Sequence, residues 1–370
     1  MKFFLANSNG QVKINNLIYY VVFFIGLSEL EFYYSEIRYF KYLILPLALF
    51  VVITYEEWKT NLNDNNVKAY LTLLLWAVVS LIINKSFSQF GLKDVFFISV
   101  YVISIVAFFN NSFSIKNLFY IYSIMVIVSF PSSDVLEFSL VESTAPFEST
   151  ACFALSAFCI YFMQTRDRVH IILSLILVVL TLKRIVIPPL IIAFLCIYCN
   201  RFFKNLLLGK VQLYVFVFAV PVALILLTLG FFDYIIEITT GRNANWITLG
   251  RTSHYQGVID IIIENPLSII FGNGIGSAYA PSVVFYKPDE LHVGNLHSDF
   301  LKIIFELGVV FYIYFFHSLI SNSNSSSRLY LYLIFFLYLS DNSLIYSGIS
   351  FVIMAILIRS HRLNLPINKN

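Results

Sequence analysis

Apolar stretches about as long as a membrane-spanning helix recur along almost the whole chain, separated by short polar connectors. Of the 370 residues, 59% are hydrophobic and only 12% are charged, whereas soluble domains are roughly 25% charged. The apolar runs do not alternate with polar residues as the strands of a membrane barrel do. The sequence therefore predicts an all-α, polytopic integral membrane protein. Its net charge of +3 gives no sign of nucleic-acid binding.

We expect about twelve transmembrane spans, with one long polar loop between the ninth and the tenth. The expected domains are an N-terminal transmembrane bundle at 1–232, the loop at 233–297, and a C-terminal transmembrane part at 298–370 that ends in a cytoplasmic tail. The expected spans lie near 16–30, 39–55, 67–84, 94–110, 115–130, 149–163, 169–182, 185–199, 211–232, 298–317, 328–340 and 343–358.

Lysine and arginine in the short connectors set the expected orientation, because cytoplasmic loops carry the excess of these residues. With the N-terminus in the cytoplasm, fourteen lysines and arginines fall on the inside and ten on the outside. Six of these ten oppose the rule, so we expect a function to keep them there. They lie in or beside the long loop, or at a break between two spans: Lys183, Arg184, Arg242, Arg251, Lys287 and Lys302.

Arginine on the outer side, where the charge rule disfavours it, indicates an anionic ligand. The guanidinium group presents a planar fork of hydrogen-bond donors that fits phosphate oxygens. Arg251 is the first candidate, and Arg184, near the outer end of a span, is the second. Lys183 is a candidate for a further phosphate contact, and Arg242 is a weaker one. Structural alternatives stay open: Lys183 and Arg184 can form a plain turn or an interfacial anchor, and Arg242 can simply solvate the loop.

His297 stands just before the tenth expected span, where a helix N-terminus lowers the pKa of a nearby imidazole. A neutral imidazole there can act as a general base on a hydroxyl group. The alternative is an ordinary histidine at a membrane interface. His254 and His292 are nearby in sequence, but their spacing matches no metal-ligand pattern, so we expect no metal site.

Three further features of the polar interval have both structural and functional interpretations. Glu306 follows Lys302 by four residues, so the two can pair on one helix face. The segment Thr252 to Glu264 predicts a short amphipathic helix that ends before a proline, with an apolar face that could lie on the membrane surface. The turn 272–276 holds three glycines and permits a tight backbone path or a close approach to a sugar or phosphate. No strand–turn–helix pattern surrounds it, which argues against nucleotide binding.

Together these motifs resemble the O-antigen ligase and O-antigen polymerase superfamily, in detail from Gly250 to Gly308. Tyr255 stands where the family usually has tryptophan, Ser298 where it has asparagine, and Lys183 where a serine often precedes the second arginine. The matching residues are Gly250, Arg251, Tyr255, Asn265, Pro266, Leu267, Gly272, Gly274, Gly276, His297, Ser298, Leu301, Glu306 and Gly308.

The resemblance implies a glycosyltransferase of the bacterial inner membrane with its active site facing the periplasm. The implied substrate is an oligosaccharide on undecaprenyl diphosphate, and neither a metal nor a nucleotide sugar is needed. Arg251 and Arg184 would hold the diphosphate and His297 would activate the acceptor hydroxyl. Lys183, Arg242, Tyr255, Gly274 and Glu306 would bind substrate. A flippase and a chain-length regulator are the implied partners.

Within the superfamily we favour a polymerase, because the sequence is idiosyncratic and rich in aromatic residues. The first alternative is a ligase that transfers finished O-antigen to lipid A-core. The second is a flippase for the same lipid-linked sugar. A transporter of that kind is expected to show two similar halves and broken helices near mid-membrane. No internal repeat is evident, and the polar residues gather in one loop.

Overall fold

The computed structural model describes residues 14–28, 39–40, 42–54, 59, 62, 64–85, 87–108, 113–129, 150–181, 183–199, 201–248, 250–279, 296–341 and 343–363. Lys287, His292 and the C-terminal tail lie outside these residues. The described residues form helices and no strand, which confirms the all-α class. The main helices are α1 (Ile14–Ser28), α2 (Ile44–Thr54), α4 (Asn65–Ile83), α5 (Gln89–Phe108), α6 (Ile115–Ser129), α7 (Ala151–Thr165), α8 (Arg168–Leu180), α9 (Ile187–Tyr198), α10 (Arg201–Leu207), α11 (Lys210–Thr228), α12 (Asp233–Thr240), α13 (Ala244–Ile247), α14 (Arg251–Glu264), α15 (Ser268–Phe271), α16 (Asp299–Leu307), α17 (Val309–Ser321), α18 (Ser325–Ser340) and α19 (Ser347–Leu363).

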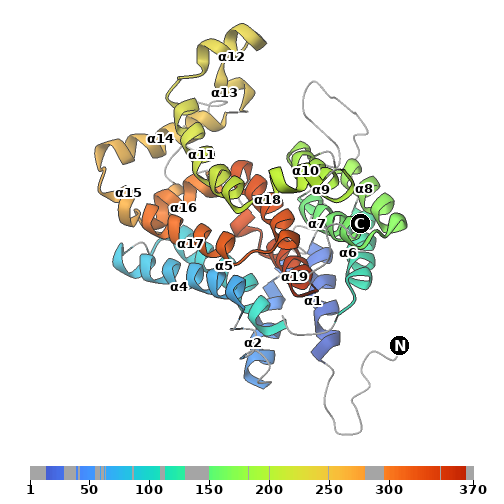
Figure 1. Cartoon of the computed structure of the whole chain (residues 1–370). Helices are drawn as coiled ribbons and strands as arrows, with labels where there is room; N and C mark the ends of the chain where they lie inside the picture. The colour runs from blue at the N-terminus through green and yellow to red at the C-terminus, as the bar shows by residue number, and fades with distance from the viewer. Residues whose placement is uncertain are drawn as a thin grey trace, which may run out of the picture.

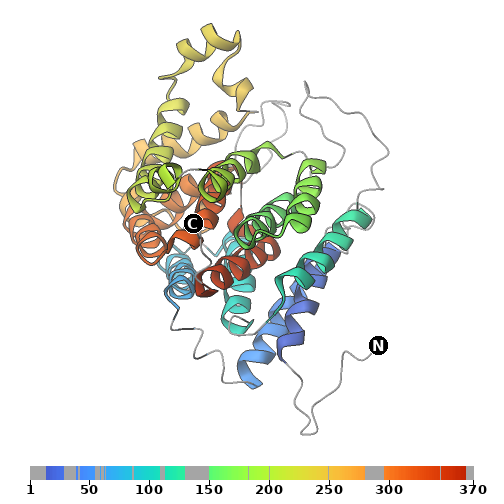
Figure 2. The same ribbon diagram turned by 45° about the vertical axis from the view of Figure 1, so that its right-hand side comes forward.

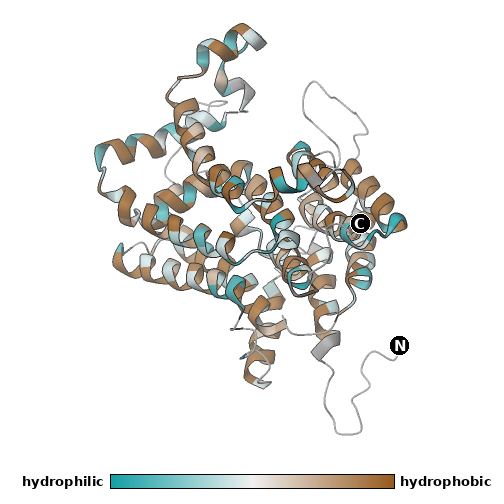
Figure 3. Cartoon of the chain, viewed as in Figure 1, coloured by the Kyte–Doolittle hydropathy of each residue, from teal (hydrophilic) through white to brown (hydrophobic). Residues whose placement is uncertain are grey.

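Each expected span contains a helix, but the helices differ in length. Three of those in the described residues, α4, α5 and α11, are long and apolar enough to cross a membrane by themselves. Shorter apolar helices lie in most of the remaining expected spans, among them α7, α8 and α18. The apolar helices fit a multi-pass membrane protein, while the number of twelve spans and the side on which the long loop lies stay predictions. Brown, hydrophobic residues cover much of the outside of the bundle in Figure 3.

The helices pack around a buried centre formed by the C-terminal part of the chain. Helix α19 contacts α5 and α7, and α18 contacts α7, α9 and α16. Helix α7 is buried on all sides from Ala151 to Ile160. Helices α12 and α13 project from this bundle at the end of α11, as Figures 1 and 2 both show. The polar interval therefore begins on a projecting part and returns to the bundle through α14, α15 and α16.

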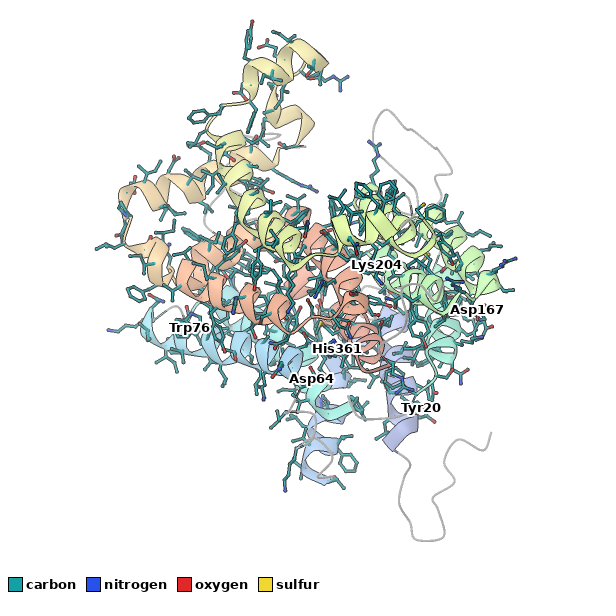
Figure 4. The ribbon with its side chains drawn as sticks, in the orientation of Figure 1. Tyr20, Asp64, Trp76, Asp167, Lys204 and His361 are labelled. Atoms are coloured by element: carbon teal, nitrogen blue, oxygen red, sulfur yellow. The ribbon has the colours of Figure 1, made fainter. Side chains whose placement is uncertain are left out.

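The expected tenth span at 298–317 is not one helix, which corrects that prediction. It breaks at Gly308, where φ is +87° and the chain turns between α16 and α17. The backbone of α15 lies so close there that a Cβ on Gly308 would meet the Ile270 carbonyl oxygen at 2.3 Å. The Trp76 indole donates a hydrogen bond to the Leu307 carbonyl oxygen at 3.1 Å, and Figure 4 labels Trp76 on α4. The break is therefore held by packing from two sides.

Replacing Gly308 with alanine should lower the thermal stability of the detergent-solubilised protein and its yield. The new Cβ needs a strained left-handed backbone, at a cost of about 1–3 kcal/mol, and also collides with a carbonyl group. Gly257→Ala is the matched control, because Gly257 lies inside α14 with nothing within 4 Å of an added Cβ. There alanine should stabilise slightly, since it is the better helix former. Equal thermal midpoints for the two variants would contradict the role of Gly308.

Candidate functional site

Helix α14 begins at Arg251 because Gly250, with φ +83°, turns the chain into it. It ends at Glu264, just before Asn265 and Pro266, as the sequence predicts. Its apolar face does not lie on the membrane surface, which corrects that expectation. Tyr255 and Val258 pack in one cluster with Phe305 of α16, and residues of α11 lie against it. Because α11 and α16 offer apolar protein surface to this face, α14 is buried against them, and Arg251 is half-buried at its N-terminus.

His297 is held in place through its backbone rather than its ring. The Tyr255 hydroxyl donates a hydrogen bond to the His297 carbonyl oxygen at 2.9 Å. The next residue, Ser298, donates its hydroxyl to the Tyr338 carbonyl oxygen of α18 at 3.1 Å. Asp299 Oδ2 then accepts from the Leu344 backbone N–H at 2.9 Å. Among the residues that the structure describes, the ring of His297 contacts the His254 ring and makes no hydrogen bond.

The surroundings of His297 favour a neutral ring. Partial burial lowers its pKa below the usual value, and the positive charge of Arg251 lowers it further. His254, whose ring centroid lies 6.5 Å away and perpendicular, adds to the lowering. Lys183 acts in the same direction and Asp341 in the opposite one. Ionisable groups from three separate segments, α14, Lys183 and Asp341, therefore act on this imidazole.

Lys183 and Asp341 form a largely buried ion pair, with 16% and 10% of their side chains exposed, and both charges affect the pKa of His297. The Lys183 ammonium lies 3.1 Å from Asp341 Oδ2, and the Tyr346 hydroxyl donates to Asp341 Oδ1 at 2.8 Å. Lys183 also lies over the Phe153 ring, 5.1 Å from its centroid. Asp341 is not among the site residues predicted from the sequence. The signal that could have found it is a carboxylate between the last two apolar runs, in a connector expected on the same side as the long loop.

Arg251 brings a second positive charge to the same place. Its side chain is half-buried and makes no ion pair with the described residues. Its charge acts on His297, on Tyr255 and on Tyr346. Arg251, Lys183 and Asp341 thus all lie near enough to His297 for their charges to affect its pKa, and Lys183 and Asp341 are paired with each other. We call these four residues the charged cluster.

The remaining predicted site residues lie elsewhere or have a structural contact. Arg184 is exposed, next to Lys183, at the start of a short 3-10 helix. Arg242 is exposed in the turn after α12, on the projecting part. The Gly274 backbone N–H donates to the Glu306 carbonyl oxygen at 3.0 Å, and Glu306 Oε1 accepts from the Ala278 N–H at 3.1 Å. These two contacts dock the glycine turn on α16, and a role for either residue in substrate binding stays a prediction.

Lys302 is not a loop cation, contrary to its place among the six outer charges. Its ammonium lies 2.5 Å from Asp94 Oδ2 of α5, and both side chains are inside the bundle, 3% and 0% exposed. The Tyr279 hydroxyl donates to the other oxygen of Asp94 at 2.9 Å, and the Tyr279 ring lies under the Lys302 ammonium at 4.8 Å. This buried group joins α5, α16 and the glycine turn, so it supports the segment that leads from His297.

The charged cluster combines two cations with an imidazole whose lowered pKa favours the neutral base, a combination suited to transfer from an anionic leaving group. Within the residues described, no group of three or more His, Cys, Asp or Glu side chains is placed to hold a metal ion.

One comparison with known proteins finds a match, to a family model that covers less than half of the chain. A family model described as O-antigen ligase matches residues 169–316, from α8 to α17. The matched segment contains Lys183, Arg184, Arg251 and His297 and ends before Asp341. No curated protein and no solved structure matches the chain. The match supports the ligase and polymerase superfamily, whose members are glycosyltransferase-like enzymes of lipopolysaccharide assembly, and does not separate the two activities.

Proposed function

We propose that the chain is a polysaccharide polymerase that transfers a growing glycan from undecaprenyl diphosphate to the next lipid-linked repeat unit. The observation that carries the proposal is the charged cluster, in which two cations face a neutral histidine. A lipid diphosphate is the leaving group that such cations suit, and a sugar hydroxyl is the nucleophile that such a base suits. The apolar helices and the family match support a multi-pass membrane protein, and we place the reaction at the periplasmic face of the inner membrane.

In the proposed reaction the acceptor hydroxyl attacks the anomeric carbon of the donor sugar. The new glycosidic C–O bond forms as the C–O bond to the diphosphate breaks, and the diphosphate leaves with the electron pair. The hydroxyl proton passes to a free ring nitrogen of His297. Arg251 holds the diphosphate with its fork of donors and stabilises the charge that develops there. This matches the lowered pKa of His297, since the ring is ready to accept a proton at neutral pH.

Lys183 and Arg184 have different parts in this proposal. Lys183 is fixed by Asp341 and offers its charge at a defined position. Asp341 also interacts with His297 and favours the protonated ring, so it would stabilise the imidazolium formed during transfer. Arg184, exposed beside Lys183, would contact the diphosphate from its outer side. A flippase that supplies the donor and a regulator of chain length are the expected partners.

A ligase is the second candidate, because the matching family model is described by that activity. Both enzymes would take the same donor and release the same lipid diphosphate, and they differ only in the acceptor.

Deletion of the gene in its host should leave surface lipopolysaccharide with a core and a single repeat unit. Complementation with the wild-type chain should restore a ladder on a silver-stained gel. This result is expected because ligation of one unit survives when polymerisation is lost. If the deleted strain instead carries bare core while polymer accumulates on the lipid carrier, the chain is the ligase. A normal ladder in the deleted strain would reject both activities.

A further inference from the structure

Helix α12 exposes one apolar side and has no buried residue. Tyr234, Ile235 and Ile238 are 75%, 59% and 66% exposed, and their helical spacing places them on one side of the helix. Asp233 and Glu237 lie on the other side at helical spacing, four residues apart. Brown and teal residues meet on α12 in Figure 3, at the far end of the projecting part. Two exposed phenylalanines, Phe231 and Phe232, directly precede the helix and add apolar surface to the projecting part.

The position of α12 in the chain places it at the boundary of the bilayer. It follows α11, one of the three helices long enough to cross a membrane. At 1.5 Å per residue, the 19 residues of α11 span about 28 Å, close to the roughly 30 Å hydrocarbon core. Much of α11 is exposed on its outer side, including Val211, Val215 and Val222. Its end at Thr228 therefore reaches the level of the lipid head groups, and α12 begins within a few residues of that level.

We infer that α12 is an interfacial helix that binds the surface of the lipid bilayer. Tyr234, Ile235 and Ile238 enter the boundary between head groups and acyl chains, while Asp233 and Glu237 stay in water. Such short helices bind membranes through buried apolar area, and tyrosine suits the boundary because one end of its side chain is apolar and the other polar. This is the membrane-surface role that the sequence suggested for α14, which the structure buries against protein instead.

Binding of α12 would have a consequence for the charged cluster. Helix α12 contacts α13, and α13 contacts α14, whose first residue is Arg251. A helix fixed at the lipid surface would hold this segment, and with it Arg251, near the level of the lipid head groups. The membrane contact itself does not depend on the proposed enzymatic activity.

Spin labels on the two sides of α12 test the inference in the full chain. A label is attached to Ile238→Cys or, as matched control, to Glu237→Cys, both in a Cys199→Ser background because Cys199 is the least buried of the four cysteines. The chain is reconstituted in vesicles of phosphatidylcholine and phosphatidylglycerol. Collision rates with dissolved oxygen and with a neutral nickel chelate are then compared by electron paramagnetic resonance.

The label at position 238 should show a several-fold higher oxygen-to-nickel ratio than the label at 237, because oxygen concentrates in the bilayer and the chelate stays in water. High nickel accessibility at both positions would mean that α12 stands in water and would overturn the inference. Position 238 could instead be shielded from both reagents. If that shielding is lost in vesicles that hold a single chain, a second copy of the chain covers this side and the inference is overturned. None of these readouts uses catalysis, so failure here and failure of the proposed function are separate results.

Discussion

Replacement of Lys302 by methionine should unfold much of the protein at temperatures where the wild type is stable. The change leaves the carboxylate of Asp94 buried without the cation that lies 2.5 Å from it. Removing one partner of a buried ion pair costs about 3–5 kcal/mol, because the remaining charge stays uncompensated. The measurement is the thermal midpoint of the detergent-solubilised protein, followed by tryptophan fluorescence or by size-exclusion profile after heating.

Two controls separate the buried pair from a general effect of losing a lysine. The double variant Asp94→Asn, Lys302→Met removes both charges and leaves no unpaired charge in the bundle. This variant should therefore recover part of the stability that Lys302→Met loses. The variant Lys116→Met breaks the pair between Lys116 and Asp167, where the lysine side chain is 53% exposed, and should change the midpoint little. A Lys302→Met protein as stable as the wild type would show that the pair does not hold α5 to α16.

The position of the helices could be predicted because hydropathy is a local property of the chain. The interruption at Lys183 and Arg184 could be anticipated for the same reason, and the structure ends α8 at Leu180 before it. The break at Gly308 could not, because an apolar run continues on both sides of this residue. The helix is interrupted there by the close approach of α15 and by the hydrogen bond from Trp76, and both come from other parts of the chain.

The charged cluster was predictable only in part, for a similar reason. Arg251 and His297 carry chemistry that residue type and motif indicate, so they could be named from sequence. That Lys183 lies beside them depends on how α18 packs, and its partner Asp341 is 158 residues away. Lys302 was misplaced as an outer charge because its partner Asp94 is 208 residues away. Sequence spacing indicates which residues can share a helix face, but not which helices meet.

Replacement of Arg251 by alanine should reduce polymer synthesis at least about 100-fold, as loss of one preorganised charge-stabilising group does in other enzymes. Lysine at this position should restore only part of the activity, because it keeps the charge and loses the planar fork. The measurement is the ladder in a deleted strain complemented to equal membrane levels, quantified above one repeat unit. Arg242→Ala is the matched control, since Arg242 is exposed on the projecting part and should matter much less.

The same experiment on the two neighbouring histidines distinguishes a base from a structural residue. His297→Ala should abolish the ladder, whereas His254→Ala should only weaken it, because the proposed proton acceptor is the ring of His297. The His254 ring centroid lies 6.5 Å from that of His297, and a positive charge on His254 lowers the pKa of His297. Both variants should keep the thermal midpoint of the wild type, since the fold holds His297 through its carbonyl oxygen, which alanine also provides. An intact ladder in His297→Ala, or in Arg251→Ala, would remove that residue from the reaction and leave it with a structural role.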